Sequence, residues 1–587
     1  MQHSNNLLEN FMSKTPNFDA KIKPILDALQ PGQIINCPIT KKDWALDDKE
    51  IEICRRFQVP PCPIEPFTRM KYLNGFSVGL TIFWKPHALT GQPILSAFHP
   101  DLPFKIINDK ENLAADPTDY GFDYNSQVSF FDLMWRLETT FPFGATRNSN
   151  VDDSSLVVGC VKTRNCFIAC GAMATNCFYV LTAINCEDSI DISNCERVTG
   201  SFSVGGSQHI SDSVFIFESR SCLNSFFLFD CQECDSCFGA INRRHKKYLW
   251  FNEQLSESEY KKRLTETDLS DRRQFDECWK KFIKMVNEQA VWPAAHGFGN
   301  IDSTGERLYN CVRCQDCFFE HSSTDLYRCR FGVNLTDSFY ASGSAEAANY
   351  YMVTGGLYGS SLKFSSGCYS SNDLEYCIDC KDCEYCFGCV NLRRKKYCIL
   401  NHQYTPDEYW RLVDQIKCDM LERGEYGQFW PAKMSLAGFQ QSVGDLFIHY
   451  SHEDLEKFGA LIVDPTHGQV FAPQVDTSNA KSAEEIPNDL LSAEPFVGVP
   501  IYDKAAGRYY SVLKAEYDVY KNKKWPFPTE HYATRLFRLL DFSYGPISEE
   551  RACASCGQMT TTYNNRAFPD RRIYCQDCYL KFLEENN

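Results

Sequence analysis

Four cysteines near the end of the sequence have the residue type and spacing of a metal site. They form two C-x-x-C pairs with eighteen residues between them: Cys553, Cys556, Cys575 and Cys578. Each pair makes a knuckle, and two knuckles bring four thiolates around one tetrahedral Zn²⁺ ion. All four ligands would be sulfur, so no coordination position is left for a catalytic water. The spacing therefore predicts a structural zinc ribbon over residues 550–587, with Zn²⁺ as its cofactor.

A second, degenerate ribbon is predicted within residues 45–145. Residues 88–92 and 104–107 align with residues 554–558 and 572–574 of the C-terminal ribbon. In that alignment the four ligand positions carry other residue types: His87, Thr90, Asn108 and Glu111. We interpret this module as a ribbon fold that has lost its metal.

Another set of cysteines recurs at a strict spacing of three: Cys377, Cys380, Cys383, Cys386 and Cys389. Three uses fit such a run: an iron–sulfur cluster, additional zinc ligands, or small buried side chains in a packed interior. A related stretch earlier in the chain has Ala240 opposite Cys389 and Leu249 opposite Cys398. Because a ligand set is not expected to lose members in this way, the packed interior is favoured, and a redox or metal-handling role remains the alternative.

The related stretch reveals an internal duplication at a constant offset of 149 positions. The segment from Asp230 to Tyr260 reappears from Asp379 onward. Identical residues at that offset include Cys231, Cys234, Cys237, Phe238, Gly239, Asn242, Arg244, Lys246, Lys247, Tyr248, Asn252, Gln254, Glu259 and Tyr260. Self-similarity at a fixed period predicts a repeat architecture.

Short units that begin with Asn-Cys precede each duplicated segment. In the first copy they are Asn165-Cys166, Asn176-Cys177, Asn185-Cys186 and Asn194-Cys195, at spacings of 11, 9 and 9. Runs rich in Val, Ile and Phe between such units are long enough for one strand each. Asn and Asp tolerate the left-handed backbone of a tight corner, and cysteine fits the inside of that corner. The pattern predicts a parallel β-solenoid, whose rungs are buried by stacking on one another.

A helix is predicted to follow each copy. Ser256 with Glu259, and Thr405 with Glu408, have the spacing of capping boxes, and the first helix is expected to continue with a break to Val286. The predicted fold class is mainly β with α: duplicated, Cys-rich parallel β-solenoid repeats with capping helices, flanked by small α+β modules and a C-terminal zinc ribbon. The predicted segments are an N-terminal helix (1–35), the degenerate ribbon (45–145), repeat copy 1 (150–295), repeat copy 2 (298–425), a mixed α/β module (426–545) and the zinc ribbon (550–587).

Composition narrows the function classes. The chain has 587 residues, thirty cysteines and a net charge of −16, which disfavours nucleic acid as a partner. Without a recognisable signal peptide or apolar span, we expect a soluble, cytoplasmic protein with reduced thiols. Short basic runs at 242–247 and 393–396 are interpreted as solvated edges. Phosphate-binding loops, H-E-x-x-H and G-x-S-x-G motifs are absent from the sequence, so no enzyme is predicted.

The duplicated block, the later sequence IPNDLL and the terminal C-x-x-C pairs together resemble a family of Cys-rich zinc-ribbon proteins frequent in Candidate Phyla Radiation bacteria. The resemblance covers the chain from about residue 50 onward and implies two ribbon modules flanking Cys-rich repeats. It implies no activity. The expected function is a non-catalytic scaffold that binds a protein partner or assembly. Redox or metal handling by the repeats, and nucleic-acid binding by the ribbon, are the alternatives.

Overall fold

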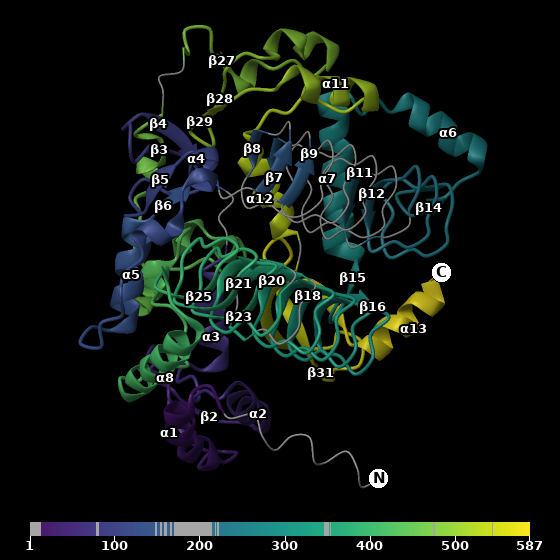
Figure 1. Cartoon of the computed structure of the whole chain (residues 1–587). Coiled ribbons are helices and arrows are strands. Elements are labelled where there is room, and N and C mark those ends of the chain that lie inside the picture. The colour runs from purple at the N-terminus through teal and green to yellow at the C-terminus, as the bar shows by residue number, and fades with distance from the viewer. Residues whose placement is uncertain are drawn as a thin grey trace. The chain divides into compact units, whose positions relative to one another are not determined.

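The chain folds into two compact units, neither of which is continuous in the sequence. Unit 1 contains residues 1–145 and 297–471, and unit 2 contains residues 146–296 and 472–587. The computed structural model describes residues 13–77, 81–146, 149–152, 155–157, 161–164, 167–169, 214–217, 219, 222–345, 351–352, 354–357, 359–472, 476–542 and 544–586 (Figure 1). The predicted segments are thus distributed over both units, and the chain passes between them after residues 145, 296 and 471.

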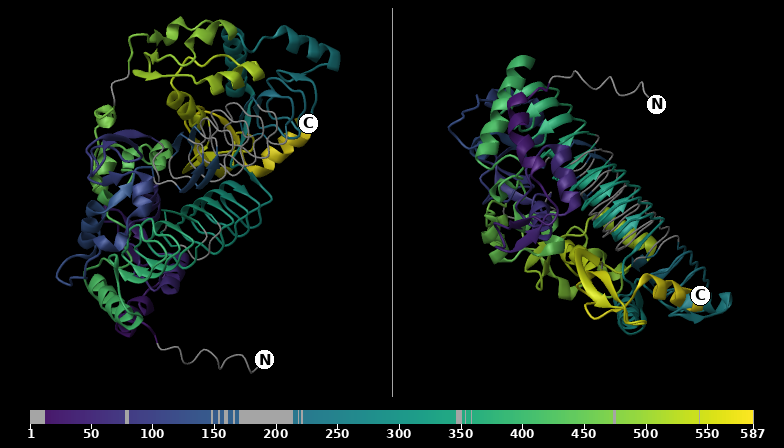
Figure 2. Two further views of the ribbon diagram at one scale, coloured as in Figure 1. Left: turned by 45° about the horizontal axis from the view of Figure 1, so that its top comes forward. Right: turned by 90° about the horizontal axis from the view of Figure 1, so that it is seen from below.

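A parallel β-solenoid of about eight turns, at residues 297–399, belongs to unit 1, and we call it solenoid 2. Its rungs stack in a single row (Figure 2). In the first rung, paired residues are eleven positions apart, as in Gly297↔Leu308; in the later rungs they are twelve apart, as in Phe318↔Arg330 and Glu384↔Lys396. The strands are β16 (Gly297–Phe298), β17 (Gly305–Tyr309), β18 (Cys317–His321), β19 (Arg330–Val333), β20 (Ser342–Ala345), β21 (Thr354–Leu357), β22 (Ser366–Tyr369), β23 (Asn372–Glu375), β24 (Glu384–Phe387) and β25 (Lys396–Ile399), with β26 (His402–Gln403) antiparallel at the end. This confirms the predicted solenoid.

Each rung has four sides of three residues. Left-handed backbone recurs at every third position, for example at Asp379 (φ 53°), Asp382 (φ 53°), Tyr385 (φ 52°), Gly388 (φ 62°) and Asn391 (φ 56°). The residue after each of these corners is buried in the solenoid, so the prediction of an Asn or Asp corner followed by an inward cysteine is confirmed. The rung of twelve residues is longer than the predicted unit, whose Asn-Cys markers are 11 and 9 residues apart. The two lengths differ because Asn and Asp can occupy any of the four corners of a rung, so successive markers need not lie one full rung apart.

The interior of solenoid 2 is narrow and lined mainly by thiols. Its buried residues are separated from one another by multiples of three positions: Leu308, Cys311, Cys314, Cys317, Leu326, Cys329, Leu335, Ala341, Leu362, Cys368, Leu374, Cys377, Cys380, Cys383, Cys386, Cys389, Leu392 and Cys398. The Sγ atom of Cys377 lies 3.5 Å from the carbonyl oxygen of Glu375 and 3.4 Å from that of Cys386 in the next rung. Ser365, one rung earlier, occupies the equivalent position and accepts from the Cys377 N–H at 3.2 Å. These contacts favour the packed interior as the use of the spacing-three cysteines.

Glu320 is an ionisable residue at an inward position of solenoid 2. It is 1% exposed, and neither of its Oε atoms has a hydrogen-bond partner among the described residues. Gly332 leaves room for it one rung later, because a Cβ at that position would overlap Oε2 of Glu320. Burial, and then the nearby thiols of Cys317 and Cys311, raise the pKa of the Glu320 carboxyl well above its usual range.

We expect Glu320→Gln to stabilise unit 1 increasingly as the pH rises. A carboxyl with a raised folded pKa weakens the fold progressively as the pH climbs from about 4.3, its unfolded value, toward the folded pKa. Glutamine does not ionise, so the gain in Tm should widen between pH 5 and pH 8, by roughly 2–4 °C for each kcal/mol. Glu384→Gln, on the outward side of the same solenoid, is the control in thermal unfolding. A gain that does not vary with pH would contradict this prediction.

Solenoid 1, in unit 2, has the same spacing of twelve between paired residues. β7 (Ser149–Asp152) pairs with β9 (Val161–Arg164), β8 (Ser155–Val157) with β10 (Phe167–Ala169), and β11 (Val214–Phe217) with β12 (Phe226–Phe229), all parallel. The hairpin β13–β14 (Leu249–Trp250 and Glu253–Gln254) closes it. The predicted corner pairs Asn165-Cys166, Asn176-Cys177, Asn185-Cys186 and Asn194-Cys195 lie outside the described residues.

Helices leave both solenoids where capping boxes are predicted. In α8 (Pro406–Glu422), both bonds of the Thr405–Glu408 box are present. In α6 (Glu257–Glu266), Ser256 Oγ accepts from the Glu259 N–H at 3.2 Å, but the Glu259 carboxylate pairs with Arg263 instead of closing the box. After a break, α7 (Arg272–Gln289) follows α6, as the sequence predicts.

The remaining elements of unit 1 pack along solenoid 2, from its early rungs, where Phe447 contacts Phe318, to its last rungs. The N-terminal helix α1 (Pro16–Asp27) buries Phe18, Ile22 and Leu26, and the Phe18 N–H donates to Asp414 of α8 at 2.8 Å. The other elements are β1 (Ile34–Asn36), β2 (Asp43–Ala45), α2 (Asp48–Phe57), α3 (Pro66–Asn74), β3 (Phe83–Pro86), β4 (Pro93–Ser96), β5 (Lys105–Ile107), α4 (Asp109–Ala114), α5 (Phe130–Thr140), β6 (Pro142–Gly144), α9 (Val443–Ile448) and α10 (His452–Phe458).

In unit 2, a large aromatic core joins solenoid 1 to the C-terminal region. Phe227, Trp292, Tyr517, Trp525 and Tyr544 belong to this one buried cluster. The elements beyond solenoid 1 are β15 (Val291–Pro293), β27 (Lys481–Ser482), β28 (Ile501–Asp503), β29 (Arg508–Tyr510), α11 (Lys514–Lys523), α12 (Tyr532–Asp541), β30 (Tyr544–Ala552), β31 (Met559–Asn565), β32 (Arg572–Tyr574) and α13 (Gln576–Asn586).

Candidate metal centre

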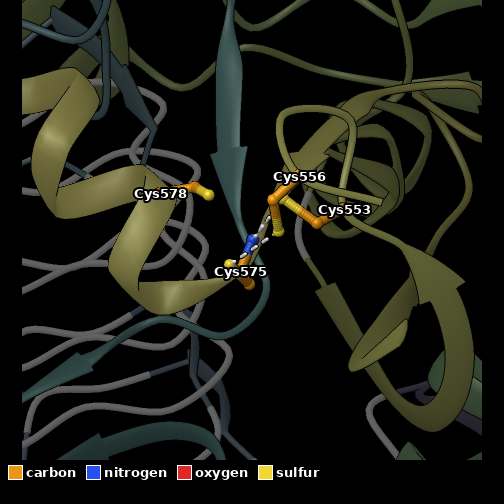
Figure 3. Close-up of side chains that lie close together, drawn as sticks. All are labelled: Cys553, Cys556, Cys575 and Cys578. Atoms are coloured by element: carbon orange, nitrogen blue, oxygen red, sulfur yellow. Dashed lines mark hydrogen bonds between the residues drawn. The ribbon is translucent and has the colours of Figure 1, made fainter. Parts of the chain in front are cut away.

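The four predicted ligands meet in unit 2. Cys553 and Cys556 lie in the turn between β30 and β31, Cys575 follows β32, and Cys578 lies in the first turn of α13 (Figure 3). Their four Sγ atoms all lie within 4.8 Å of one another, and those of Cys556 and Cys575 are 3.8 Å apart. Sulfur atoms bound to Zn²⁺ at about 2.3 Å in a tetrahedron are separated by about 3.8 Å. The geometry therefore fits a four-sulfur metal site.

Backbone N–H groups prepare Cys553 to act as a thiolate ligand. The N–H groups of Ser555 and Cys575 lie 3.4 Å and 3.2 Å from its Sγ atom. Burial alone would raise the pKa of Cys553, but the N–H groups of Cys556, Cys575 and Ser555 lower it to about 6. Metals bind the thiolate form of cysteine, so the lowered pKa favours metal binding at neutral pH.

The helix that carries Cys578 is anchored to solenoid 1. Tyr579 donates a hydrogen bond from its hydroxyl to Asp230, and Arg244 Nη2 donates to the same hydroxyl at 3.1 Å. Arg244 also forms an ion pair with Asp230 at 2.8 Å. Asn242 donates to Asp230 at 2.6 Å. The residue after the fourth ligand is thus held by a buried polar network of the duplicated segment.

The same knuckle turn occurs at the degenerate ribbon. The Cys553 N–H donates to Gln558 O at 2.8 Å, and the His87 N–H donates to Gln92 O at 2.9 Å. Four positions after the first ligand position, Gly557 and Gly91 both have left-handed backbone, with φ of 78° and 70°. The hairpin β3–β4 therefore has the turn of β30–β31 at its tip.

Hydrogen bonds join the predicted ligand positions of the degenerate ribbon. His87 Nε2 lies 2.6 Å from Glu111 Oε2, and its Nδ1 accepts from the N–H groups of Leu89 and Thr90, both at 3.3 Å. Asn108 and Glu111 form the capping box of α4. Both ring nitrogens of His87 are therefore already engaged, which is compatible with a knuckle that closes without metal.

A third knuckle, which sequence reasoning missed, lies between β1 and β2. The Cys37 N–H donates to Lys42 O at 2.8 Å, and Lys41 has left-handed backbone (φ 59°). Burial alone would raise the pKa of Cys37, but the Thr40 hydroxyl and the N–H groups of Thr40, Glu65 and Ile39 lower it. The repeated sequences Cys-Pro-Ile-Thr at 37–40 and Cys-Pro-Ile-Glu at 62–65 are the signal that could have revealed it.

Only the C-terminal knuckle has a full ligand set in the part of the chain that the structure describes. There, Cys553, Cys556, Cys575 and Cys578 are the one group of His, Cys, Asp or Glu side chains arranged to hold a metal ion.

The basic runs of the duplicated segments are paired with acidic residues. Ion pairs join residues in adjacent rungs: His245–Glu233 (3.0 Å), Lys247–Asp235 (3.4 Å) and Lys396–Glu384. Arg393 instead donates to Asn112 Oδ1 at 2.6 Å. Much of the positive charge is therefore neutralised by neighbouring side chains of the same unit.

Comparisons of the chain with models of protein families, with curated proteins and with solved structures find no match. The resemblance to Cys-rich zinc-ribbon proteins of Candidate Phyla Radiation bacteria therefore stays a prediction. Within the described residues, no helix has both the length and the apolar character required to cross a membrane.

Proposed function

We propose that this protein is a non-catalytic structural or interaction scaffold, in which a zinc ribbon fixes the end of unit 2. The observation that carries the proposal is the site of four sulfur ligands, with Sγ atoms that all lie within 4.8 Å of one another. A metal held by four thiolates has no position for water or substrate, so its role is structural. Zinc is the ion that best suits tetrahedral sulfur ligation in a cytoplasmic protein.

The solenoids suit a partner-binding role. Repeat proteins expose extended surfaces on which protein partners bind. Outward side chains of solenoid 2 form ion pairs from rung to rung, as in Arg313–Asp325 at 2.6 Å and Arg328–Asp316 at 3.1 Å. A surface of mixed charge on a chain of net charge −16 favours a protein partner over nucleic acid. We therefore propose a protein partner or assembly in the cytoplasm.

Elemental analysis and cobalt substitution test the proposal together. We expect one zinc per chain and a colourless protein. After exchange of zinc for Co²⁺, the visible spectrum should be that of a tetrahedral four-thiolate ion. Because the coordination is complete, azide or imidazole should leave this spectrum unchanged.

Two results would contradict the proposal. A spectrum that changes when azide is added would show an open coordination position, as in a catalytic site. A brown protein that contains iron and sulfide would support the redox alternative, in which cysteines such as Cys380 and Cys383 bind a cluster.

A further inference from the structure

The duplication extends beyond the solenoids to the helix and strand that precede each of them. Helix α5 ends at Thr140 and α7 at Gln289, two positions related by the offset of the duplicated segments. Strand β6 spans Pro142–Gly144, and β15 spans Val291–Pro293, again at that offset. Each copy of the repeat therefore consists of a helix–strand segment, a solenoid and an exit helix.

Each helix–strand segment forms a parallel pair with the last strand of a ribbon. In unit 1, Pro142 of β6 pairs with Lys105 of β5. In unit 2, Val291 of β15 pairs with Arg572 of β32. Because Lys105 and Arg572 are equivalent in the alignment of the two ribbons, the two units have the same register at this contact.

The helix that follows the last strand of each ribbon, α4 in unit 1 and α13 in unit 2, is also held at an equivalent position, and we call these the ribbon helices. Asn112 follows Glu111 as Tyr579 follows Cys578 in the other ribbon. In unit 1, Arg393 Nη1 donates to Asn112 O at 2.9 Å and Asn391 Nδ2 to its Oδ1 at 3.0 Å. In unit 2, the equivalent residues of the first copy, Arg244 and Asn242, belong to the network that holds Tyr579. The conserved part of the duplicated segment is therefore the surface that binds a ribbon helix.

The helix–strand segments pack against the solenoid of the opposite copy. Phe130 of α5, in the first copy, contacts Tyr376 of solenoid 2 with ring centroids 5.5 Å apart. Trp279 of α7, in the second copy, contacts Phe227 of solenoid 1 at 6.3 Å. Phe130 and Trp279 are related by the offset of the duplication, and so are Phe227 and Tyr376. The same contact is thus made twice, and each time the helix belongs to one copy of the repeat and the solenoid to the other.

We propose that the two copies exchange their helix–strand segments, so that each unit is completed by the other half of the duplication. The side of each solenoid that carries Phe227 or Tyr376 is then an interaction surface for a second copy of this repeat. In the intact chain both surfaces are occupied from within, because the chain crosses between the units after residues 145 and 296. This proposal does not depend on the metal.

Cleavage of the folded full-length protein tests the exchange. A protease site inserted between His296 and Gly297 would produce pieces 1–296 and 297–587, each of which contains part of both units. We expect the pieces to co-elute at the size of the intact protein after complete cleavage, and to separate only in denaturant. Pieces that elute separately under native conditions would overturn the proposal.

Paired variants show whether the association depends on the inferred surfaces. The double variant Asn112→Ala, Arg393→Ala weakens the ribbon contact of unit 1, and Arg394→Ala, an exposed neighbour, is the matched control. In cleaved protein, we expect the double variant to release its pieces at a lower urea concentration than Arg394→Ala. Release at the same concentration for both variants would also overturn the proposal.

Discussion

Replacing Cys575 by serine is expected to abolish zinc binding and unfold the C-terminal ribbon. Cys575 joins the two knuckles, because its N–H donates to Cys553 Sγ and its own Sγ lies 3.8 Å from that of Cys556. Structural zinc contributes about 10–16 kcal/mol to the folding of small zinc modules. We expect zinc content to fall from one to near zero per chain, and α13 to lose its protection from hydrogen exchange.

The loss should extend from the ribbon to the end of solenoid 1. Once α13 unfolds, Tyr579 no longer occupies the network of Asp230 and Arg244, so amides near these residues should exchange faster. Treatment of the parent protein with a chelator should have the same effect, and added zinc should reverse it. Cys278→Ser, on α7 of the same unit, is the matched control and should keep its zinc. Full zinc content in Cys575→Ser would contradict the assignment of this ligand.

Replacing Cys377 by aspartate is expected to unfold solenoid 2, whereas replacing it by serine should have a small effect. Cys377 is fully buried, and burial raises the pKa of its thiol well above the usual range. A buried carboxylate without a partner costs about 3–5 kcal/mol. Serine already occupies the equivalent position one rung earlier, at Ser365, so Cys377→Ser should cost about 1 kcal/mol. Urea unfolding followed by tryptophan fluorescence measures both, because the chain's tryptophans include Trp430, whose ring centroid lies 5.5 Å from that of Tyr376.

The serine variant also distinguishes between two uses of the solenoid thiols, as a packed interior or as ligands of a metal cluster. If the thiols of solenoid 2 only fill space and donate to carbonyl groups, Cys377→Ser should leave the metal content unchanged. If they are cluster ligands, the same substitution should reduce iron content and visible absorption. A loss of iron in Cys377→Ser would therefore contradict the interpretation that the thiols of solenoid 2 form a packed interior.

The sequence was sufficient to predict the group of four cysteines that could hold a metal ion, and the solenoid. Two C-x-x-C pairs bring their sulfur atoms together through local knuckle turns, so the four ligands depend little on the rest of the fold. The corners of the solenoid also depend only on local sequence, because Asn and Asp at positions such as Asp379 and Asn391 favour left-handed backbone. The rung length was harder to predict, since every third residue is a corner and the spacing of corners alone does not show how many make one turn.

The exchange of helix–strand segments could not be predicted from the sequence. Phe130 and Trp279 are equivalent in the structure but differ in type, and Thr140 and Gln289 share nothing but position. Long-range packing preserves only the apolar character of such residues. In a single sequence, this apolar character looks the same as that of any other amphipathic helix, so it does not reveal the packing partner. The Cys37 knuckle was missed for a related reason, because hydroxyl and carboxylate groups replace the cysteines that identify a ribbon.

The crossings of the chain between the two units have a consequence for protein synthesis. Residues 1–145 begin unit 1, but the solenoid that completes it starts at residue 297. At about 5–20 residues per second, the ribosome needs roughly 8–30 s to make the intervening stretch. During that time the apolar side of α5, including Phe130, has no solenoid to cover it. We expect molecular chaperones that bind nascent chains to associate with this protein while it is being translated.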